Sequence, residues 1–306
     1  MSAREFAYQK QTGQKRGNNK AVFALMLLTP LFLILAVVSI YPLLYSVWTS
    51  FTDFRLSRPN DISFVGLANY AATFVNPEFL NALKNSLIYA VVAVPIEMVF
   101  GLGIAIALNK ILVLRDFART LIVIPMMLAP VVMGLMWKFM FNDQIGIINH
   151  VLRDWGWLKG PLPWLTDSSL AMVSLIIVEV WATTPFMVIL LGAGLTTISA
   201  ELYEAARIDG ATSWQCFVKI TLPMLSPIIL VALLIRGMDA FRVFDVVFTL
   251  TAGGPARATD VLSYYLYRET FINLDAGLSA AGSFLMLGVL MMAGIFLIRG
   301  LRKDDA

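Results

Sequence analysis

The chain is short of the residues on which most enzymes and metal proteins depend. Its 306 residues include one cysteine, Cys216, and one histidine, His150. A single cysteine excludes an intramolecular disulfide and a paired-cysteine metal site, and a single histidine leaves almost no material for a histidine metal site or proton relay. We interpret Cys216 as a small packing residue and His150 as a solvated loop residue. No catalytic residue and no metal site are therefore expected.

Charge is also scarce. Only 14% of the residues are charged, 59% are hydrophobic, and the mean hydropathy is +0.78. Soluble domains carry about 25% charged and about 45–50% apolar residues, so this composition excludes that class and predicts several membrane spans. The net charge of +3 does not indicate nucleic acid binding, because the basic residues gather in tails and loops, where they orient a chain in the bilayer.

A phosphate-binding loop is missing as well. The pattern Gly-x-x-x-x-Gly-Lys-Ser/Thr does not occur in the sequence, so the chain is not expected to hydrolyse ATP itself.

What the sequence does contain is long apolar runs. A polar tail, residues 1–20, precedes them, and the first run is too long for a signal-peptide core. At 1.5 Å per residue each run is long enough for a membrane helix. We predict an all-α polytopic protein with a transmembrane region of residues 21–306 and about six helices, at residues 21–48, 86–108, 121–141, 168–195, 222–250 and 276–298.

The basic residues predict the orientation of these spans. Five lie in the tail, and three lie in the link at residues 109–120. Because cytoplasmic loops are enriched in Lys and Arg, both termini are expected in the cytoplasm. The loop at about residues 196–221 is then cytoplasmic too.

That cytoplasmic loop carries a motif of fixed spacing. Glu204-Ala205-Ala206 is followed by Gly210 after three residues and by Ile220-x-Leu222-Pro223 after nine more. The pattern resembles the EAA signature of binding-protein-dependent ABC importer permeases, at all seven positions. Further positions resemble the carbohydrate branch of that family, of the maltose and glycerol-phosphate type. They are Ala211, Trp214, Phe217, Pro227 and the segments 64–70, 146–149, 239–245 and 250–255.

The resemblance implies a type I importer permease that couples to a separate ATPase. In that family the EAA element is a coupling helix that docks into the ATPase, and a bulky residue at Gly210 or a Lys at Glu204 would uncouple transport. The residues it assigns to coupling are Glu204, Ala205, Ala206, Asp209, Gly210, Ile220, Leu222 and Pro223.

The same resemblance implies the partners and the location. They are a second permease subunit, an ATPase dimer, an extracytoplasmic solute-binding protein, a carbohydrate substrate and membrane lipid, with no nucleic acid. ATP and Mg would be bound by the ATPase, so no cofactor is expected in this chain. The location would be the cytoplasmic (inner) membrane of a bacterium or archaeon.

Physical chemistry supports the motif independently. Glu204 with two alanines is expected to open a narrow helix, where an acid in the first turn suits the helix dipole. Gly210 permits a turn or a close backbone approach. Leu222-Pro223 is expected to begin the fifth span, where proline loses no hydrogen bond. The alternative is an ordinary amphipathic connector lying on the membrane.

Ionisable residues inside the spans form a second pattern. Arg236, Asp239, Arg242 and Asp245 recur every three residues with alternating sign, so each is expected to neighbour the next on one helix face. Charges in a bilayer should face protein or water. This ladder is either the wall of a sugar pathway or a structural set of ion pairs.

Two lone acids and two aromatic residues extend that second pattern. Glu97 is expected to hydrogen-bond a neighbouring helix and Glu179 to face the pathway, whereas Phe241 and Phe244 are candidate stacking surfaces for a sugar. The substrate-pathway candidates are Glu179, Asp239, Phe241, Arg242 and Asp245.

Two other classes of membrane protein are alternatives to an ABC importer permease. An ion-gradient-driven secondary transporter of a small polar solute would need no ATPase, and inverted repeats with broken helices would mark it. No convincing repeat is found. A membrane enzyme is disfavoured, because no nucleophile–base set occurs.

Overall fold

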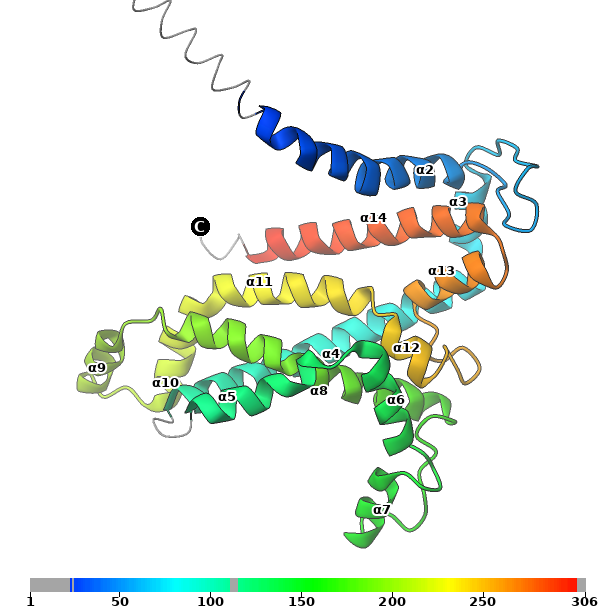
Figure 1. The fold of residues 1–306 in the computed structure, drawn as a ribbon. Helices are drawn as coiled ribbons and strands as arrows, with labels where there is room; N and C mark the ends of the chain where they lie inside the picture. The colour runs from blue at the N-terminus through cyan, green and yellow to red at the C-terminus, as the bar shows by residue number, and fades with distance from the viewer. Residues whose placement is uncertain (1–22, 24, 111–114, 302–306) are drawn as a thin grey trace, which may run out of the picture.

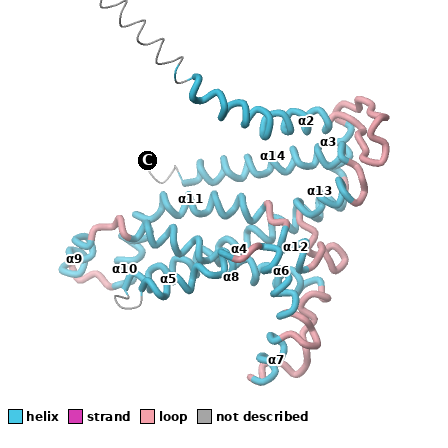
Figure 2. The backbone as a smooth tube through the Cα atoms, viewed as in Figure 1, coloured by secondary structure: helices cyan, strands magenta, loops and turns pink. Residues whose placement is uncertain are grey.

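The molecule is a bundle of long helices that run roughly side by side (Figure 1). The computed structural model describes residues 23, 25–110 and 115–301. Over these ranges the backbone forms helices and loops, with two isolated β-bridges and no assigned strand (Figure 2). The predicted all-α class is confirmed. The tail at residues 1–20, residues 111–114 of the predicted link, and Arg302 and Lys303 lie outside the described residues.

The helical elements follow one another along the chain, and the longest connections are residues 51–67, 155–167 and 251–261. They are η1 (Ala36–Ile40), α2 (Tyr41–Ser50), α3 (Ala68–Val75), α4 (Pro77–Lys110), α5 (Arg115–Val123), η2 (Ile124–Met127), α6 (Pro130–Met140), α7 (Ile147–Asp154), α8 (Ser168–Leu195), α9 (Ala200–Ile208), α10 (Ser213–Cys216), η3 (Phe217–Thr221), α11 (Leu222–Phe241), α12 (Asp245–Leu250), α13 (Leu262–Phe271) and α14 (Ala276–Leu301).

The number of membrane spans agrees with the sequence. Among the described residues, five helical segments are long and apolar enough to cross a membrane, and a bent helix pair makes a sixth if it counts as one span. The five segments are Leu25–Ser50, Pro77–Asn109, Ser168–Leu195, Ser213–Leu250 and Ala276–Phe296. The second begins nine residues before its predicted start at residue 86, because Pro77 is pre-organised for the first turn of a helix.

The third predicted span, residues 121–141, is wrong as a single continuous helix. The segments Phe117–Met127 and Pro130–Met140 meet at an angle of 94°. Ala129, which precedes Pro130, has the extended backbone (φ −62°, ψ 131°) that a following proline favours, so the helix stops there and restarts. The bend turns α6 toward α12, with which it packs.

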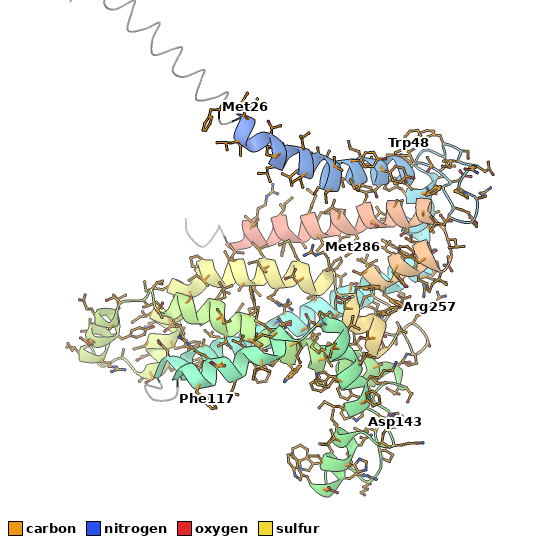
Figure 3. The ribbon with its side chains drawn as sticks, in the orientation of Figure 1. Met26, Trp48, Phe117, Asp143, Arg257 and Met286 are labelled. Atoms are coloured by element: carbon orange, nitrogen blue, oxygen red, sulfur yellow. The ribbon has the colours of Figure 1, made fainter. Side chains whose placement is uncertain are left out.

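The two ends of the bundle carry different elements. α9 and α10 lie at one end, here called the α9 end, whereas α3 and α13 lie at the opposite end (Figure 1). Phe117 lies toward the α9 end and Arg257 toward the opposite end (Figure 3). The 196–221 loop therefore lies opposite the loop that contains Arg257, as spans that alternate in direction require.

Close packing of α4 against α8 forms the centre of the bundle. The backbone of α4 approaches α8 so closely at Gly101 that an added Cβ would collide with the side chain of Met187. At Gly103, two residues later, an added Cβ would meet nothing within 4 Å in the described part of the chain. Of the Gly101-x-Gly103 pair, only the first is thus a helix-packing glycine.

This difference gives a matched test of the core. Gly101→Ala should lower the thermal unfolding temperature and reduce the amount of folded protein, because overpacking costs about 1–3 kcal/mol. Gly103→Ala should be neutral or stabilising, since alanine is about 1 kcal/mol better than glycine within a helix. Thermal unfolding in detergent measures both. Equal losses from the two variants would contradict the assigned packing.

Candidate functional site

The EAA residues lie in the second half of α9 (Ala200–Ile208). This helix begins earlier than the sequence analysis expected: Ser199 is its N-cap and accepts a hydrogen bond from the Glu201 N–H. Glu201, rather than Glu204, is therefore the acid in the first turn that suits the helix dipole. The prediction that Glu204 opens the helix is wrong, because Ser199 is the better capping residue. Glu204 and Ala205 are exposed.

Gly210 ends this helix in a Schellman motif. Its φ is +80°, its N–H donates to the Arg207 carbonyl at 3.1 Å, and the Ala211 N–H donates to the Ala206 carbonyl at 2.9 Å. An added Cβ would meet nothing within 4 Å in the described residues. Of the two roles considered for Gly210, the structure within the chain supports the turn and not the close approach.

The polypeptide then enters the fifth span earlier than expected. A capping box between Thr212 and Gln215 starts α10, which continues through η3 into α11. Pro223 is thus not at the start of a new helix. The preceding π-helical segment Phe217–Thr221, in which the Leu222 N–H bonds to the Phe217 carbonyl, widens the turn just before the proline. Such a bulge relieves the clash that proline makes inside a regular helix.

One hydrogen bond fastens α9 to the base of the fifth span. The hydroxyls of Tyr203 and Thr221 lie 2.9 Å apart, and the Thr221 side chain is buried. The contact joins α9 to the junction of η3 and α11. This helix–turn region also exposes large apolar side chains, with Ile208 86% and Trp214 70% accessible. Exposed apolar patches of this kind mark interaction surfaces.

The charges inside the spans meet in a buried cluster. The Arg236 guanidinium on α11 donates to Glu97 of α4 at 2.9 Å and to Glu179 of α8 at 2.5 Å. All three side chains are buried. The expectation that Glu97 bonds a neighbouring helix is met, but neither acid is lone. We name Glu97, Glu179 and Arg236 the central triad. Sequence reasoning missed it, although opposite charges in different apolar runs are the available signal.

The predicted ladder holds only in part. Arg236 and Asp239 are 3.8 Å apart, and Arg242 donates to Asp239 at 2.8 Å. α11 ends at Phe241, however, and Asp245 belongs to the first turn of α12. The single helical face predicted for all four residues is therefore wrong, because the backbone bends between Arg242 and Asp245.

A cavity of about 510 Å³ lies against this charged region. Its lining includes Arg236 and four of the five predicted pathway residues, namely Glu179, Asp239, Arg242 and Asp245. The broken third span supplies much of the other wall, from Pro125 to Met133. This wall could not be predicted from the sequence, because the bend that forms it was not predicted.

The fifth predicted residue, Phe241, lies elsewhere. Its side chain is 4% exposed and belongs to a second apolar cluster with Phe79 and Tyr265. Two aromatic residues line the cavity, Phe186 and Phe244, and the centroid of the Phe244 ring lies 5.1 Å from that of Tyr267.

At the end opposite α9, a charge network fixes the loop between α12 and α13. Arg268 donates to Asp260 at 2.7 Å and to Glu78 of α4 at 2.8 Å, and Glu78 also pairs with Arg257. Burial raises the pKa of the Asp260 carboxyl, against the opposing effect of the neighbouring Arg268 charge. The network ties the loop between α12 and α13 to the start of α4.

The described residues contain no group of three or more His, Cys, Asp or Glu side chains placed to hold a metal ion. The geometry therefore comprises three connected parts: an exposed helix at one end, a fifth span rooted in it, and a charged cavity beside that span.

The sequence is similar to those of known transport proteins. A family model described as "Binding-protein-dependent transport system inner membrane component" matches residues 98–303. The trehalose transport system permease protein SugA of Mycobacterium tuberculosis is 36% identical over 288 residues, which cover 94% of this chain and 91% of that protein. The trehalose/maltose transport system permease protein MalF of Thermococcus litoralis is 36% identical over 270 residues, covering 87% and 89%.

The fold is shared with a solved transporter. A chain in the crystal structure of a bacterial alginate ABC transporter, in complex with an alginate pentasaccharide-bound periplasmic protein, superposes with a TM-score of 0.80 at 22% identity. The match covers 95% of this chain and 97% of the other.

Proposed function

Because this chain belongs to the family of binding-protein-dependent transport system inner membrane components, it is a permease subunit of an ABC transporter, and we propose that it imports a carbohydrate. Trehalose, maltose and glycerol phosphate appear in the names of its relatives. Family membership does not favour the alternative of an ion-gradient-driven secondary transporter.

The observation that carries the coupling mechanism is the exposure of the EAA residues on a helix at one end of the bundle. Glu204 and Ala205 are exposed on α9, and Ile208 and Trp214 lie beside them as apolar contacts. The α9 end faces the cytoplasm. There it contacts a separate ATPase dimer, which is the subunit that binds ATP and Mg. Closure of the ATPase moves α9, and the Tyr203–Thr221 hydrogen bond passes that movement to the fifth span.

The charged cavity forms this subunit's part of the substrate pathway. Asp239, Arg242 and Asp245 are exposed to it, so their carboxylate and guanidinium groups are available to sugar hydroxyls. The ring of Phe244 offers an apolar face for a sugar ring. A second permease subunit closes the other side of the pathway, and an extracytoplasmic binding protein delivers the sugar to the end fixed by Arg268 and Asp260.

The assembled transporter provides the test of this function. Proteoliposomes that contain the chain with its partner permease and ATPase should accumulate radiolabelled sugar only with ATP inside and the loaded binding protein outside. Uptake by the purified chain alone, driven by an ion gradient, would overturn the proposal.

The pathway residues make a separate prediction. Asp239→Asn and Arg242→Gln should each reduce uptake roughly tenfold, because a hydrogen bond to a charged group contributes about 1.5–3 kcal/mol. The ATPase should still co-purify, since neither residue lies near α9. Asp61→Asn, in an exposed loop, is the control. Unchanged uptake by both pathway variants would make this wall purely structural.

A further inference from the structure

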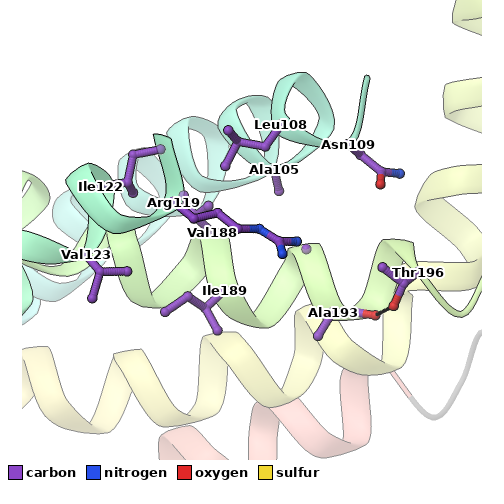
Figure 4. Close-up of a pocket in the computed structure, with 11 residues that line it drawn as sticks. Ala105, Leu108, Asn109, Arg119, Ile122, Val123, Val188, Ile189, Ala193 and Thr196 are labelled. Carbon is purple, nitrogen blue, oxygen red and sulfur yellow. Dashed lines mark hydrogen bonds between the residues drawn. The ribbon is translucent and has the colours of Figure 1, made fainter. Parts of the chain in front are cut away.

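A second cavity lies at the α9 end, away from the substrate pathway. It has a volume of about 380 Å³ and lies between the ends of α4, α5 and α8 (Figure 4). Nothing in the transport mechanism uses it. It adjoins Thr196, three residues before the N-cap of α9, so it abuts the root of the coupling helix.

The lining of this cavity changes from polar to apolar along its length. Arg119 extends its guanidinium toward the side where Asn109 and Thr196 lie, whereas Ile122 and Val123 lie at the other side (Figure 4). None of the described residues that line it is acidic. The cavity thus offers a cation near the membrane boundary and an apolar wall that leads toward the membrane interior.

From this arrangement we propose that the cavity binds an anionic phospholipid of the cytoplasmic leaflet. Arg119 pairs with the headgroup phosphate, and the first segment of an acyl chain lies along Ile122 and Ile189. The orientation used here rests on the proposed function, which places the α9 end in the cytoplasm.

Two further observations favour a lipid over a soluble anion. Most of the cavity lining is aliphatic, which a free phosphate would leave in contact with water. In addition, the segment 109–120 holds Lys110, Arg115 and Arg119 against the single acid Asp116. Clusters of basic residues beside a span attract anionic lipid at the cytoplasmic surface.

A lipid bound there would stiffen the support of the coupling helix. Its headgroup would join the end of α4 to α5 and to the last turn of α8, from which the chain passes directly into α9. Occupancy should therefore increase the fraction of ATP turnover that is coupled to transport.

Photolabelling tests the site directly. The complete transporter, reconstituted in phosphatidylcholine, is exposed to a phosphatidylglycerol analogue with a photoreactive acyl chain, and the labelled peptides are mapped. We expect label on residues 115–127 and 188–196. Arg119→Gln should reduce it about fivefold, the loss expected for one basic residue at an anionic surface. Ala193→Leu, which fills the cavity, should reduce it as well.

The controls separate the possible results. Arg299→Gln removes an exposed basic residue at the end of α14, outside the cavity, and should leave the label unchanged. Equal labelling by a phosphatidylcholine analogue, full displacement by inorganic phosphate, or loss of a partner subunit from Arg119→Gln would each overturn the proposal. Labelling is read without transport, so a failure of sugar uptake alone would count against the proposed function and not against the lipid site.

Discussion

Arg236→Met should prevent the protein from accumulating in a folded form. The substitution leaves Glu97 and Glu179 buried without their cation, and breaking a buried ion pair in this way costs about 3–5 kcal/mol. That is a large part of a typical stability of about 5–15 kcal/mol. Because the triad joins α4, α8 and α11, the loss should affect the whole bundle. The amount of protein in the membrane and its unfolding temperature in detergent measure the effect.

A neighbouring arginine serves as the control for this prediction. Arg242→Met breaks an ion pair with Asp239 whose side chains are 60% and 47% exposed, so its effect on stability should be about 0–1 kcal/mol. Adding Glu97→Gln and Glu179→Gln to Arg236→Met should restore part of the lost protein, because no uncompensated charge remains buried. If Arg236→Met melts like the wild-type protein, the triad does not hold the helices together.

Gly210→Val should abolish coupling while leaving the chain folded and inserted. A β-branched residue does not tolerate a φ of +80°, so the Schellman motif opens and the end of α9 is displaced. Displacing a central docking element costs about 2 kcal/mol, a roughly thirtyfold loss of ATPase affinity. Glu204→Lys, which reverses an exposed charge on α9, should uncouple transport as well. Sugar uptake and co-purification of the ATPase measure both variants.

Gly156 offers a closely matched control for this substitution. It ends α7 in the same motif, with a φ of +75°, and its N–H donates to the Arg153 carbonyl at 2.8 Å. At either glycine an added Cβ meets nothing within 4 Å among the residues that the structure describes. Gly156→Val therefore carries the same local strain in a different loop and should retain ATPase binding. A similar loss of ATPase from both variants would mean that strain, and not the position of α9, is responsible.

Much of the fold followed from the sequence because membrane spans are set by local properties. A run of about 20 apolar residues crosses the bilayer whatever surrounds it, so the number of spans could be counted. The break in the third span could not be placed, because Pro125 and Pro130 are tolerated within membrane helices when neighbouring groups compensate. The packing of α6 against α12 decided the outcome.

The candidate site divides in the same way. The spacing of Glu204, Gly210 and Pro223 sufficed to recognise the EAA pattern, since a motif is a property of consecutive residues. The starts of the two helices could not be predicted as well. Ser199 caps α9 before Glu204, and the π-helical segment before Pro223 makes α11 continuous with the preceding helix. Whether Glu97 and Glu179 were isolated depended on a single residue, Arg236, which lies 139 positions from the first and 57 from the second.

The sequence by itself determined the class of protein, the number of spans and the presence of the EAA pattern, because composition, run length and fixed spacing require no knowledge of distant contacts. Only the tertiary structure decided that Arg236 joins two acids from other helices, that Asp245 leaves the face of Arg236, and that Phe244 rather than Phe241 reaches the cavity. The reason is that a buried charge is stabilised by whichever opposite charge the packing of helices brings within about 4 Å, and that packing is a property of the folded bundle.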